Sequence, residues 1–153
     1  MKVKTRIFGE INVPDNNVMF FEKGIIGFPD LQRFALMRDE DKPDAAIMWL
    51  QSLDEGEFAL PVLVPNMVID DYAPSVDDGL LQTLGEFEAN ELMLLVTITV
   101  PSDIKKMSVN LKAPIIINHR NLHACQAVAE NEEYEVKHMI YEKLKKKKEK
   151  KFR

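Results

Sequence analysis

The sequence has a single cysteine, Cys125, and no apolar run that approaches the roughly 20 residues needed to cross a membrane. One cysteine excludes an intrachain disulfide framework and is typical of a protein from a reducing compartment. The first residues, MKVKTRIFGEINV, alternate charged and apolar side chains and therefore lack the apolar segment of a signal peptide. Together these absences predict a cytoplasmic protein.

Basic residues are scarce over most of the chain. Residues 1–142 hold 12 Lys or Arg against 24 Asp or Glu, a net charge of −12, and residues 39–91 hold 14 acids against Lys42 alone. The last eleven residues hold the other eight basic side chains and one acid. An acidic body repels nucleic-acid phosphates and attracts basic proteins. We therefore expect no direct nucleic-acid contact and interpret the basic end as a solvated helix end.

Motifs for catalysis and for metal binding are missing as well. Neither a nucleophile elbow nor a glycine-rich phosphate loop occurs. His119, His123 and Cys125 are close in sequence, but no second Cys or His cluster is present to complete a four-ligand zinc site. Apolar neighbours predict a packed, unreactive thiol at Cys125. The sequence predicts no enzyme, no metal and no cofactor.

The pattern of apolar residues predicts a mostly β protein. Short alternating stretches bounded by Gly, Pro, Asn and Asp indicate about ten strands. The predicted strands lie within residues 3–13, 17–21, 34–37, 46–52, 58–65, 91–101, 107–118, 122–130 and 134–141. Pro114 indicates an edge or a bulge in the stretch 107–118.

One short helix is predicted within residues 75–87. Asp77 or Asp78 provides its N-cap, and Gly85 its end. Many short strands with a single helix favour a small, closed or nearly closed antiparallel β-barrel. We expect one such domain over residues 1–141, followed by a Lys-rich C-terminal extension over residues 142–153.

Residues 20–34, FFEKGIIGFPDLQRF, combine several Phe with glycines and a proline. The glycines permit a sharp bend, and the proline restrains the exit from it. Side chains alternate along a strand, so only one of Phe20 and Phe21 is expected in the core. We predict that Phe28 and Phe34 close one end of the barrel.

This stretch resembles the signature F-x-x-G-I-x-G-F-x-x-x-x-x-F of the FliW family, cytoplasmic flagellar assembly factors. The matching residues are Phe21, Gly24, Ile25, Gly27, Phe28 and Phe34. Further motifs follow in the family's order, namely LQS at 50–52, Tyr72, VTITVP at 96–101, VNLKAPIIIN at 109–118, Gln126 and YEVKHMI at 134–140. The resemblance spans about residues 1–141.

The resemblance implies a regulator with a small antiparallel barrel fold. FliW-like proteins bind flagellin in the cytoplasm, and after flagellin is exported the freed protein binds CsrA, a small dimeric translational repressor. CsrA then releases the flagellin message. We therefore expect flagellin and a CsrA-type repressor as partners of a monomeric protein that has no membrane contact.

The acidic segment and the Leu-rich helix provide a candidate contact surface for these partners. Carboxylates can face a basic partner, and apolar side chains of the helix can anchor it. The candidate contact residues are Asp70, Asp71, Tyr72, Asp77, Asp78, Leu81, Glu86 and Phe87. The competing interpretation is a solvated acidic loop with a helix cap.

Other functions stay open at this point. The Lys-rich tail could bind RNA or an acidic membrane directly, and the protein could serve flagellin as a chaperone without CsrA. A pocket that contains carboxylates or histidines with perturbed pKa values would favour an enzyme.

Overall fold

The computed structural model describes residues 1–39, 41 and 46–151, with side chains through Lys146. The strands are β1 (Lys2–Thr5), β2 (Gly9–Asn12), β3 (Met19–Phe21), β4 (Arg33–Met37), β5 (Met48–Ser52), β6 (Ala59–Leu63), β7 (Leu92–Thr99), β8 (Ser108–Val109), β9 (Ile115–Asn118), β10 (His123–Gln126) and β11 (His138–Met139). The α-helices are α1 (Asp78–Gln82) and α2 (Tyr141–Lys151). Short 3-10 turns are η1 (Asp15–Asn17), η2 (Pro65–Met67), η3 (Ala89–Glu91) and η4 (Ile104–Lys106).

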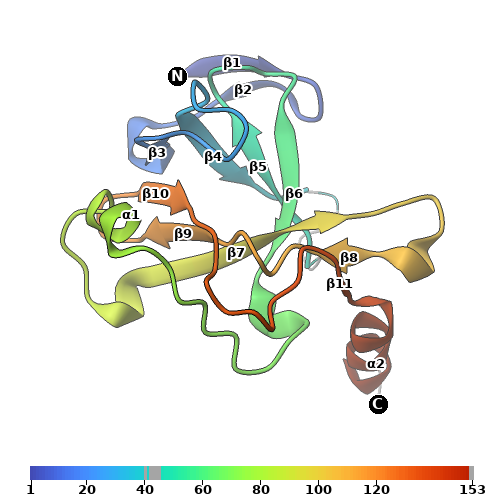
Figure 1. The fold of residues 1–153 in the computed structure, drawn as a ribbon. Helices are drawn as coiled ribbons and strands as arrows, with labels where there is room; N and C mark the ends of the chain where they lie inside the picture. The colour runs from blue at the N-terminus through green and yellow to red at the C-terminus, as the bar shows by residue number, and fades with distance from the viewer. Residues whose placement is uncertain (40, 42–45, 152–153) are drawn as a thin grey trace.

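Seven strands close into a barrel in the order β7-β6-β5-β4-β3-β10-β9 and back to β7 (Figure 1). Strand β7 closes it, because its first half pairs with β9 and its second half with β6 and then β8. The predicted small β-barrel is confirmed. One pair in it is parallel: β3 runs beside β10, with Phe20 opposite His123. No hairpin joins these two strands, so their directions are not forced to oppose.

The barrel interior is filled from the bent stretch of residues 20–34 and from the strands opposite it. Phe21 and Phe34 are fully buried, and their rings meet edge to face at 5.0 Å. Phe20 is 37% exposed, which confirms that only one of the two adjacent phenylalanines enters the core. Phe28 is 48% exposed, and its ring lies 4.8 Å from that of Phe58, which packs against the core; that Phe28 closes an end of the barrel stays a prediction.

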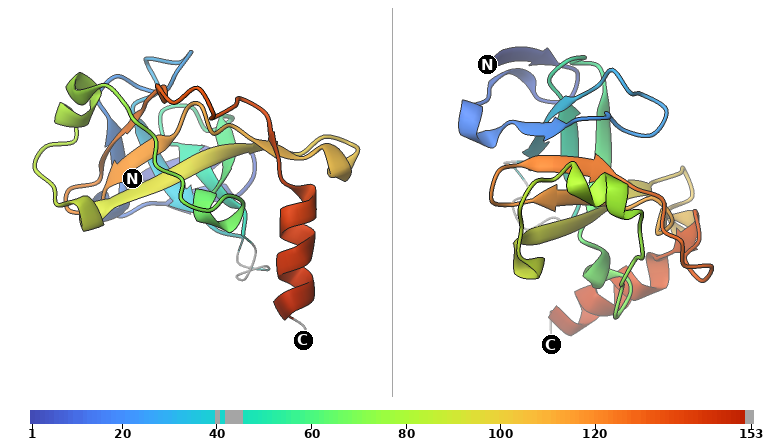
Figure 2. Two further views of the ribbon diagram at one scale, coloured as in Figure 1. Left: turned by 60° about the horizontal axis from the view of Figure 1, so that its bottom comes forward. Right: turned by 60° about the vertical axis from the view of Figure 1, so that its left-hand side comes forward.

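Three further apolar clusters are formed with segments around the barrel, and Figure 2 shows how the β1–β2 hairpin and the two helices lie about it. The β1–β2 hairpin covers the cluster of Val13, Ala35 and Leu53. Helix α1 covers a second cluster around Leu84. Val109 of β8 and Ile140, which follows β11, contribute to the third, and Leu144 of α2 packs against it. The barrel is therefore wrapped on several sides, and each wrapping segment has its own apolar contact.

The predicted strand of residues 107–118 is two strands, β8 and β9. Between them the Asn110 side-chain oxygen accepts hydrogen bonds from the backbone N–H groups of Lys112 and Ala113, which turns the chain before Pro114. The predicted strand 134–141 shortens to His138–Met139. The Lys-rich extension forms the second helix, α2, and the division of the chain into residues 1–141 and 142–153 stays a prediction. None of the described helices is long and apolar enough to cross a membrane.

Candidate functional site

All eight predicted contact residues lie in the long connection between β6 and β7, residues 64–91, here called the acidic connection. It holds seven Asp or Glu and no Lys, Arg or His. The connection leaves β6 through η2, crosses the outside of the barrel, forms α1 and reaches β7 through η3 (Figure 1). Its position therefore depends on what attaches it to the barrel.

Two tyrosines attach the first part of the acidic connection. The Tyr72 hydroxyl donates a hydrogen bond of 2.6 Å to the Leu111 carbonyl, and its ring lies 4.7 Å from that of Tyr134. The Tyr134 hydroxyl accepts a hydrogen bond from the backbone N–H of Ala73 at 2.8 Å. Burial raises the pKa of Tyr72 well above its usual range, and Tyr134 adds to the shift. Ring and hydroxyl of Tyr72 are both engaged within the protein, so this residue positions the connection.

Asn131 holds the next residues of the acidic connection. Its side-chain oxygen accepts from the backbone N–H of Ser75 at 2.7 Å, and its amide donates to the Ala73 carbonyl at 3.2 Å. The backbone N–H of Glu130 donates to the Ser75 carbonyl at 2.7 Å. These bonds keep the chain against the barrel where it has no regular structure of its own.

Helix α1 is only five residues long and depends on its apolar face. Asp77, one of the two residues predicted as N-cap, is the N-cap. Its side chain accepts a hydrogen bond from the backbone N–H of Gly79 at 3.1 Å. Leu84 is fully buried, and Leu81 and Phe87 pack partly buried against the same cluster. The two predicted apolar anchors are therefore largely used in holding α1 to the barrel.

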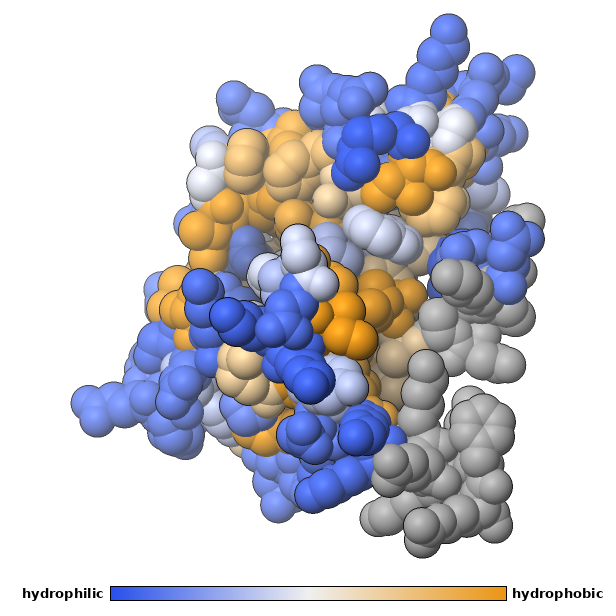
Figure 3. All heavy atoms as spheres, turned by 90° about the vertical axis from the view of Figure 1, so that its right-hand side faces the viewer, coloured by the Kyte–Doolittle hydropathy of each residue, from blue (hydrophilic) through white to orange (hydrophobic). Residues whose placement is uncertain are grey.

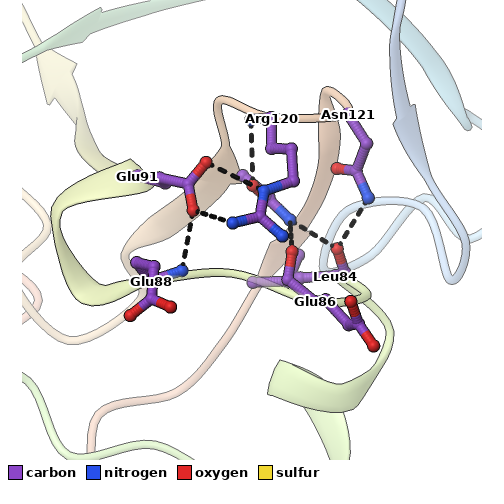
Figure 4. A network of polar contacts seen from close by, with 7 residues as sticks. Leu84, Glu86, Glu88, Glu91, Arg120 and Asn121 are labelled. Atoms are coloured by element: carbon purple, nitrogen blue, oxygen red, sulfur yellow. Dashed lines mark hydrogen bonds and ion pairs between the residues drawn. The ribbon is translucent and has the colours of Figure 1, made fainter.

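The chain that follows α1 is held by amide side chains from the end of β9 and from the turn after it (Figure 4). Asn118 is fully buried and donates to the carbonyls of Leu84 at 2.8 Å and Glu86 at 3.0 Å. Asn121 donates a further bond of 3.0 Å to Leu84. Leu84 and Glu86 follow α1, where the chain has no regular hydrogen-bonding pattern, and these amides bond to their carbonyls.

An ion pair closes the connection just before β7. Arg120 donates two hydrogen bonds to the carboxylate of Glu91, at 2.6 and 3.0 Å, and the Glu88 backbone N–H donates a third at 2.9 Å (Figure 4). The bond from Arg120, with help from the Glu88 N–H, lowers the pKa of Glu91. The same bond raises the pKa of Arg120. The negative charge of Glu91 is therefore already paired with Arg120 within the protein.

The remaining predicted carboxylates are exposed, and the structure places them in two groups along the connection. Asp70 and Asp71 precede the tyrosine contact, whereas Asp77, Asp78 and Glu86 surround α1. Each group presents negative charge without a basic neighbour from the connection itself. The eight predicted residues thus divide into two exposed acidic groups and three packed residues, Tyr72, Leu81 and Phe87.

One exposed carboxylate meets a basic side chain from elsewhere in the chain. Lys143 of α2 lies 3.4 Å from Asp70, and both side chains are solvent-accessible. Surface pairs of this kind contribute at most about 1 kcal/mol. A basic partner could therefore displace Lys143 easily.

Concave apolar surface is present at another place. A cavity of about 360 Å³ lies between residues 11–17 and the barrel strands, lined mainly by apolar side chains, with His119 among the polar ones. Its apolar lining includes Ile11, Val13, Met19, Met93, Ile117 and Leu122. None of the eight predicted contact residues lines it.

The His and Cys residues of the β9–β10 region do not converge on one point. His119 is exposed, the ring of His123 lies edge to face on Phe20 at 5.8 Å, and Cys125 is buried. Burial raises the pKa of the Cys125 thiol to about 11, so it stays protonated near neutral pH. Among the residues that the structure describes, no group of three His, Cys, Asp or Glu could hold a metal ion.

Comparison with known proteins identifies the family. Residues 2–140 match the family model described as FliW protein. The chain belongs to the FliW family. The flagellar assembly factor FliW of Lachnoclostridium phytofermentans is 44% identical over 145 residues, which are 94% of this chain and 93% of the relative. The flagellar assembly factor FliW of Lachnospira eligens is 44% identical over 148 residues, 95% of this chain and 98% of the relative.

A solved structure shares the fold. A crystal structure of the flagellar assembly factor FliW superposes with a TM-score of 0.83 at 27% sequence identity, covering 91% of this chain and 96% of that one. The match of fold and family is what the motifs of residues 20–34, 50–52 and 109–118 predicted.

The FliW motifs themselves have structural roles in this chain. A Cβ on Gly24 would lie 2.5 Å from the carbonyl oxygens of Phe28 and Pro29, so the bend admits only glycine there. Gln51 of the LQS motif is fully buried, and its amide donates to the carbonyls of Gly56 and Phe58 at 3.1 and 3.2 Å. The signature thus marks the corners of the barrel.

Sequence reasoning missed the side chains that attach the acidic connection. They are Asn118, Arg120, Asn121, Asn131 and Tyr134. Asn118 ends the predicted strand 107–118 and Arg120 and Asn121 follow it, and polar residues at such a position can also donate to a neighbouring segment.

Proposed function

We propose that this FliW-family chain acts in the cytoplasm as a flagellar assembly factor that binds flagellin and, when free, binds and antagonises a CsrA-type translational repressor. The observation that carries the proposal is the acidic connection, a segment of seven carboxylates without a basic residue that is fixed on the outside of the barrel. A fixed carboxylate surface suits a basic protein partner, because its charges need not be ordered upon binding.

The repressor side of the proposal rests on electrostatics. A protein that binds RNA does so through basic surface, which the exposed carboxylates of the acidic connection attract. Negative charge docked beside bound RNA raises the electrostatic energy of the phosphates and weakens their binding. If the repressor binds RNA and this protein at different places, the two affinities are coupled reciprocally, typically by about 1–3 kcal/mol.

The flagellin side of the proposal rests on apolar surface. An amphipathic helix docks by placing apolar side chains into a groove. The cavity between residues 11–17 and the barrel strands provides such a lining, and its volume of about 360 Å³ suits one or two large side chains. Neither partner interaction requires a catalytic group.

The proposal is tested by competition between the two partners. The purified protein is immobilised and exposed to flagellin, to a CsrA-type repressor, and to both in sequence. We expect each to bind alone, and saturating flagellin to reduce repressor binding at least about tenfold, which is a coupling within the usual range.

Two outcomes would contradict the proposal in different ways. Binding of flagellin without any binding of the repressor would leave a flagellin chaperone that is independent of CsrA. Simultaneous binding of both at full affinity would remove the switch between partners.

A further inference from the structure

Large apolar side chains protrude where β7 ends and β11 begins. Val100, Ile104 and Met139 are each more than half exposed. Val100 follows β7, Ile104 begins η4, and Met139 pairs with Ser108 shortly after η4. Figure 3 looks onto this side of the molecule and shows hydrophobic side chains next to strongly hydrophilic ones. Val100 and Met139 lie close together in the sheet, because Met139 pairs with Ser108, and Ser108 pairs with Thr99, which precedes Val100.

Lysines surround these apolar side chains. Helix η4 ends in Lys105 and Lys106, and α2, which packs beside η4, presents Lys145 and Lys146. All four are exposed. We call this surface the basic face, defined by Val100, Ile104, Lys105, Lys106, Met139, Lys145 and Lys146. The sequence adds five more Lys or Arg and one Glu over residues 147–153.

The basic face is attached to the barrel. Ile140 is fully buried, and its backbone N–H donates to the Met107 carbonyl at 3.2 Å. Leu144 packs into the apolar cluster that contains Ile98 and Val109. Leu144 thus holds α2 against the barrel beside η4, while Lys145 and Lys146 stay exposed.

Acidic groups on the basic face are few. Asp103 is the N-cap of η4, and its carboxylate accepts a hydrogen bond from the backbone N–H of Lys105 at 3.2 Å. Glu142 lies in the first turn of α2. Lys143 is occupied by Asp70 of the acidic connection. The net charge of −5 thus hides an uneven distribution: the acidic connection holds seven acids and no basic residue, whereas the basic face presents four exposed lysines.

We propose that the basic face binds reversibly to the surface of an anionic lipid bilayer. Ile104 with Val100 and Met139 enters the boundary between headgroups and acyl chains, while the lysines lie among the anionic headgroups. The lysines alone would give only electrostatic attraction to the anionic headgroups. Insertion of the apolar side chains of the β7–β8 connection adds a hydrophobic contribution. Single-stranded RNA suits this surface less well, since its bases stack on aromatic rings and the protruding side chains are aliphatic.

The inference is tested by co-sedimentation of the full chain with vesicles. Vesicles of phosphatidylcholine with phosphatidylserine are compared with vesicles of phosphatidylcholine alone. We expect binding to the anionic vesicles only, and weaker binding as salt is raised. The assay contains neither flagellin nor repressor, so its result is independent of the proposed function.

Substitutions separate the two contributions. Lys105→Gln with Lys106→Gln should lower the partition coefficient about tenfold or more, given what each lysine near an anionic surface contributes. Ile104→Ser should lower it about threefold or more through loss of apolar contact. All three side chains are exposed, so the thermal unfolding midpoint should not change.

Matched controls come from the same chain. Lys2→Gln with Lys4→Gln removes the same charge from β1, which lies at the other end of the molecule from α2 (Figure 1). Val128→Ser removes an aliphatic side chain that is 55% exposed, against 54% for Ile104. Both controls should bind vesicles like the unaltered protein.

Three results would overturn the inference. The first is equal binding to the two kinds of vesicle, and the second is an equal loss in the controls. The third is a pair of results: single-stranded RNA binds and its binding requires Lys105 and Lys106, while vesicle binding is unchanged by Ile104→Ser. This pair would assign the basic face to RNA.

Discussion

Asn118 in β9 donates hydrogen bonds to the carbonyl of Leu84, 34 residues earlier, at 2.8 Å and to that of Glu86 at 3.0 Å. Asn118 is fully buried, and so is the side chain of Leu84. One side chain of the barrel wall therefore holds the backbone that follows α1, on the path of the acidic connection back to β7. The exposed carboxylates of α1 are placed by a residue that never reaches the surface.

Replacing Asn118 should loosen the whole second half of the acidic connection. Asn118→Ala leaves the Leu84 and Glu86 carbonyls with fewer donors and opens a small cavity, so we expect a loss of about 2–3 kcal/mol in the free energy of unfolding. Asn121→Ala is the control, because Asn118 still donates to the Leu84 carbonyl when the bond from Asn121 is lost, and the other bond lost, from the His123 N–H to the Asn121 oxygen, is exposed. It should cost about 1 kcal/mol or less. Urea unfolding of the two variants measures both, and equal losses would contradict the role of Asn118.

The two glycines of the bent stretch should respond differently to alanine. Both have positive φ, 66° at Gly24 and 88° at Gly27, which costs an alanine about 1–2 kcal/mol. A Cβ at Gly24 also meets the Phe28 and Pro29 carbonyl oxygens at 2.5 Å, whereas nothing lies within 4 Å of one at Gly27. Gly24→Ala should therefore lower the thermal midpoint far more than Gly27→Ala, or prevent folding. Similar midpoints for the two variants would show that the bend tolerates a shift of its backbone.

Much of the barrel follows from local rules of sequence. Alternation of apolar residues located the strands, and the corner at residues 20–34 was predicted because glycines and a proline have few other uses inside a β protein. The contact of Phe28 with Phe58 joins residues 30 positions apart, which no local pattern encodes. The parallel pairing of β3 with β10 is long-range in the same sense.

The candidate site was predictable in charge but not in geometry. The absence of basic residues from the acidic connection is a property of the sequence. Its attachment through Asn118, Asn131 and Tyr134 depends on segments that fold against it from 32 or more residues away. The packed state of Tyr72 follows from that attachment. Lys42, Glu40 and Asp44, which entered the charge count, lie outside the described residues.

The contact of Tyr72 with Leu111 and Tyr134 should make the free energy of unfolding depend on pH in the alkaline range. The pKa of Tyr72 in the folded protein is raised above its ordinary value of 10.0, so the folded state holds this proton more tightly than the unfolded state. Its contribution to stability is complete below pH 10 and falls as the pH rises above it. Tyr72→Phe has no such proton, and we expect its free energy of unfolding to fall less steeply with pH in that range.

The measurement is urea unfolding at several pH values on both sides of the ordinary tyrosine pKa. Tyr72 is half-buried, so solvent screening keeps its effect well below the limit of about 1.4 kcal/mol per pH unit for one proton. Tyr141→Phe is the control, since it removes a hydroxyl outside this contact. Identical pH profiles for the unaltered protein and Tyr72→Phe would contradict the prediction.

Neutralising the exposed acids of the connection should weaken repressor binding through its salt dependence. Asn replaces Asp70, Asp71, Asp77 and Asp78 with little change of shape, and it also caps helices and tolerates the positive φ of 56° at residue 71. The control replaces Glu10, Asp15, Glu22 and Asp30 by their amides, which changes the net charge equally, from −5 to −1.

Because only local charge should matter at short range, the first variant should bind a CsrA-type repressor about tenfold or more weakly at low salt, mainly through a slower association rate. The difference should shrink as salt is raised, since the screening length falls to about 3 Å at 1 M. Association kinetics over a salt series measure both effects, and unchanged affinity and salt slope in the first variant would remove the acidic connection from the repressor interface.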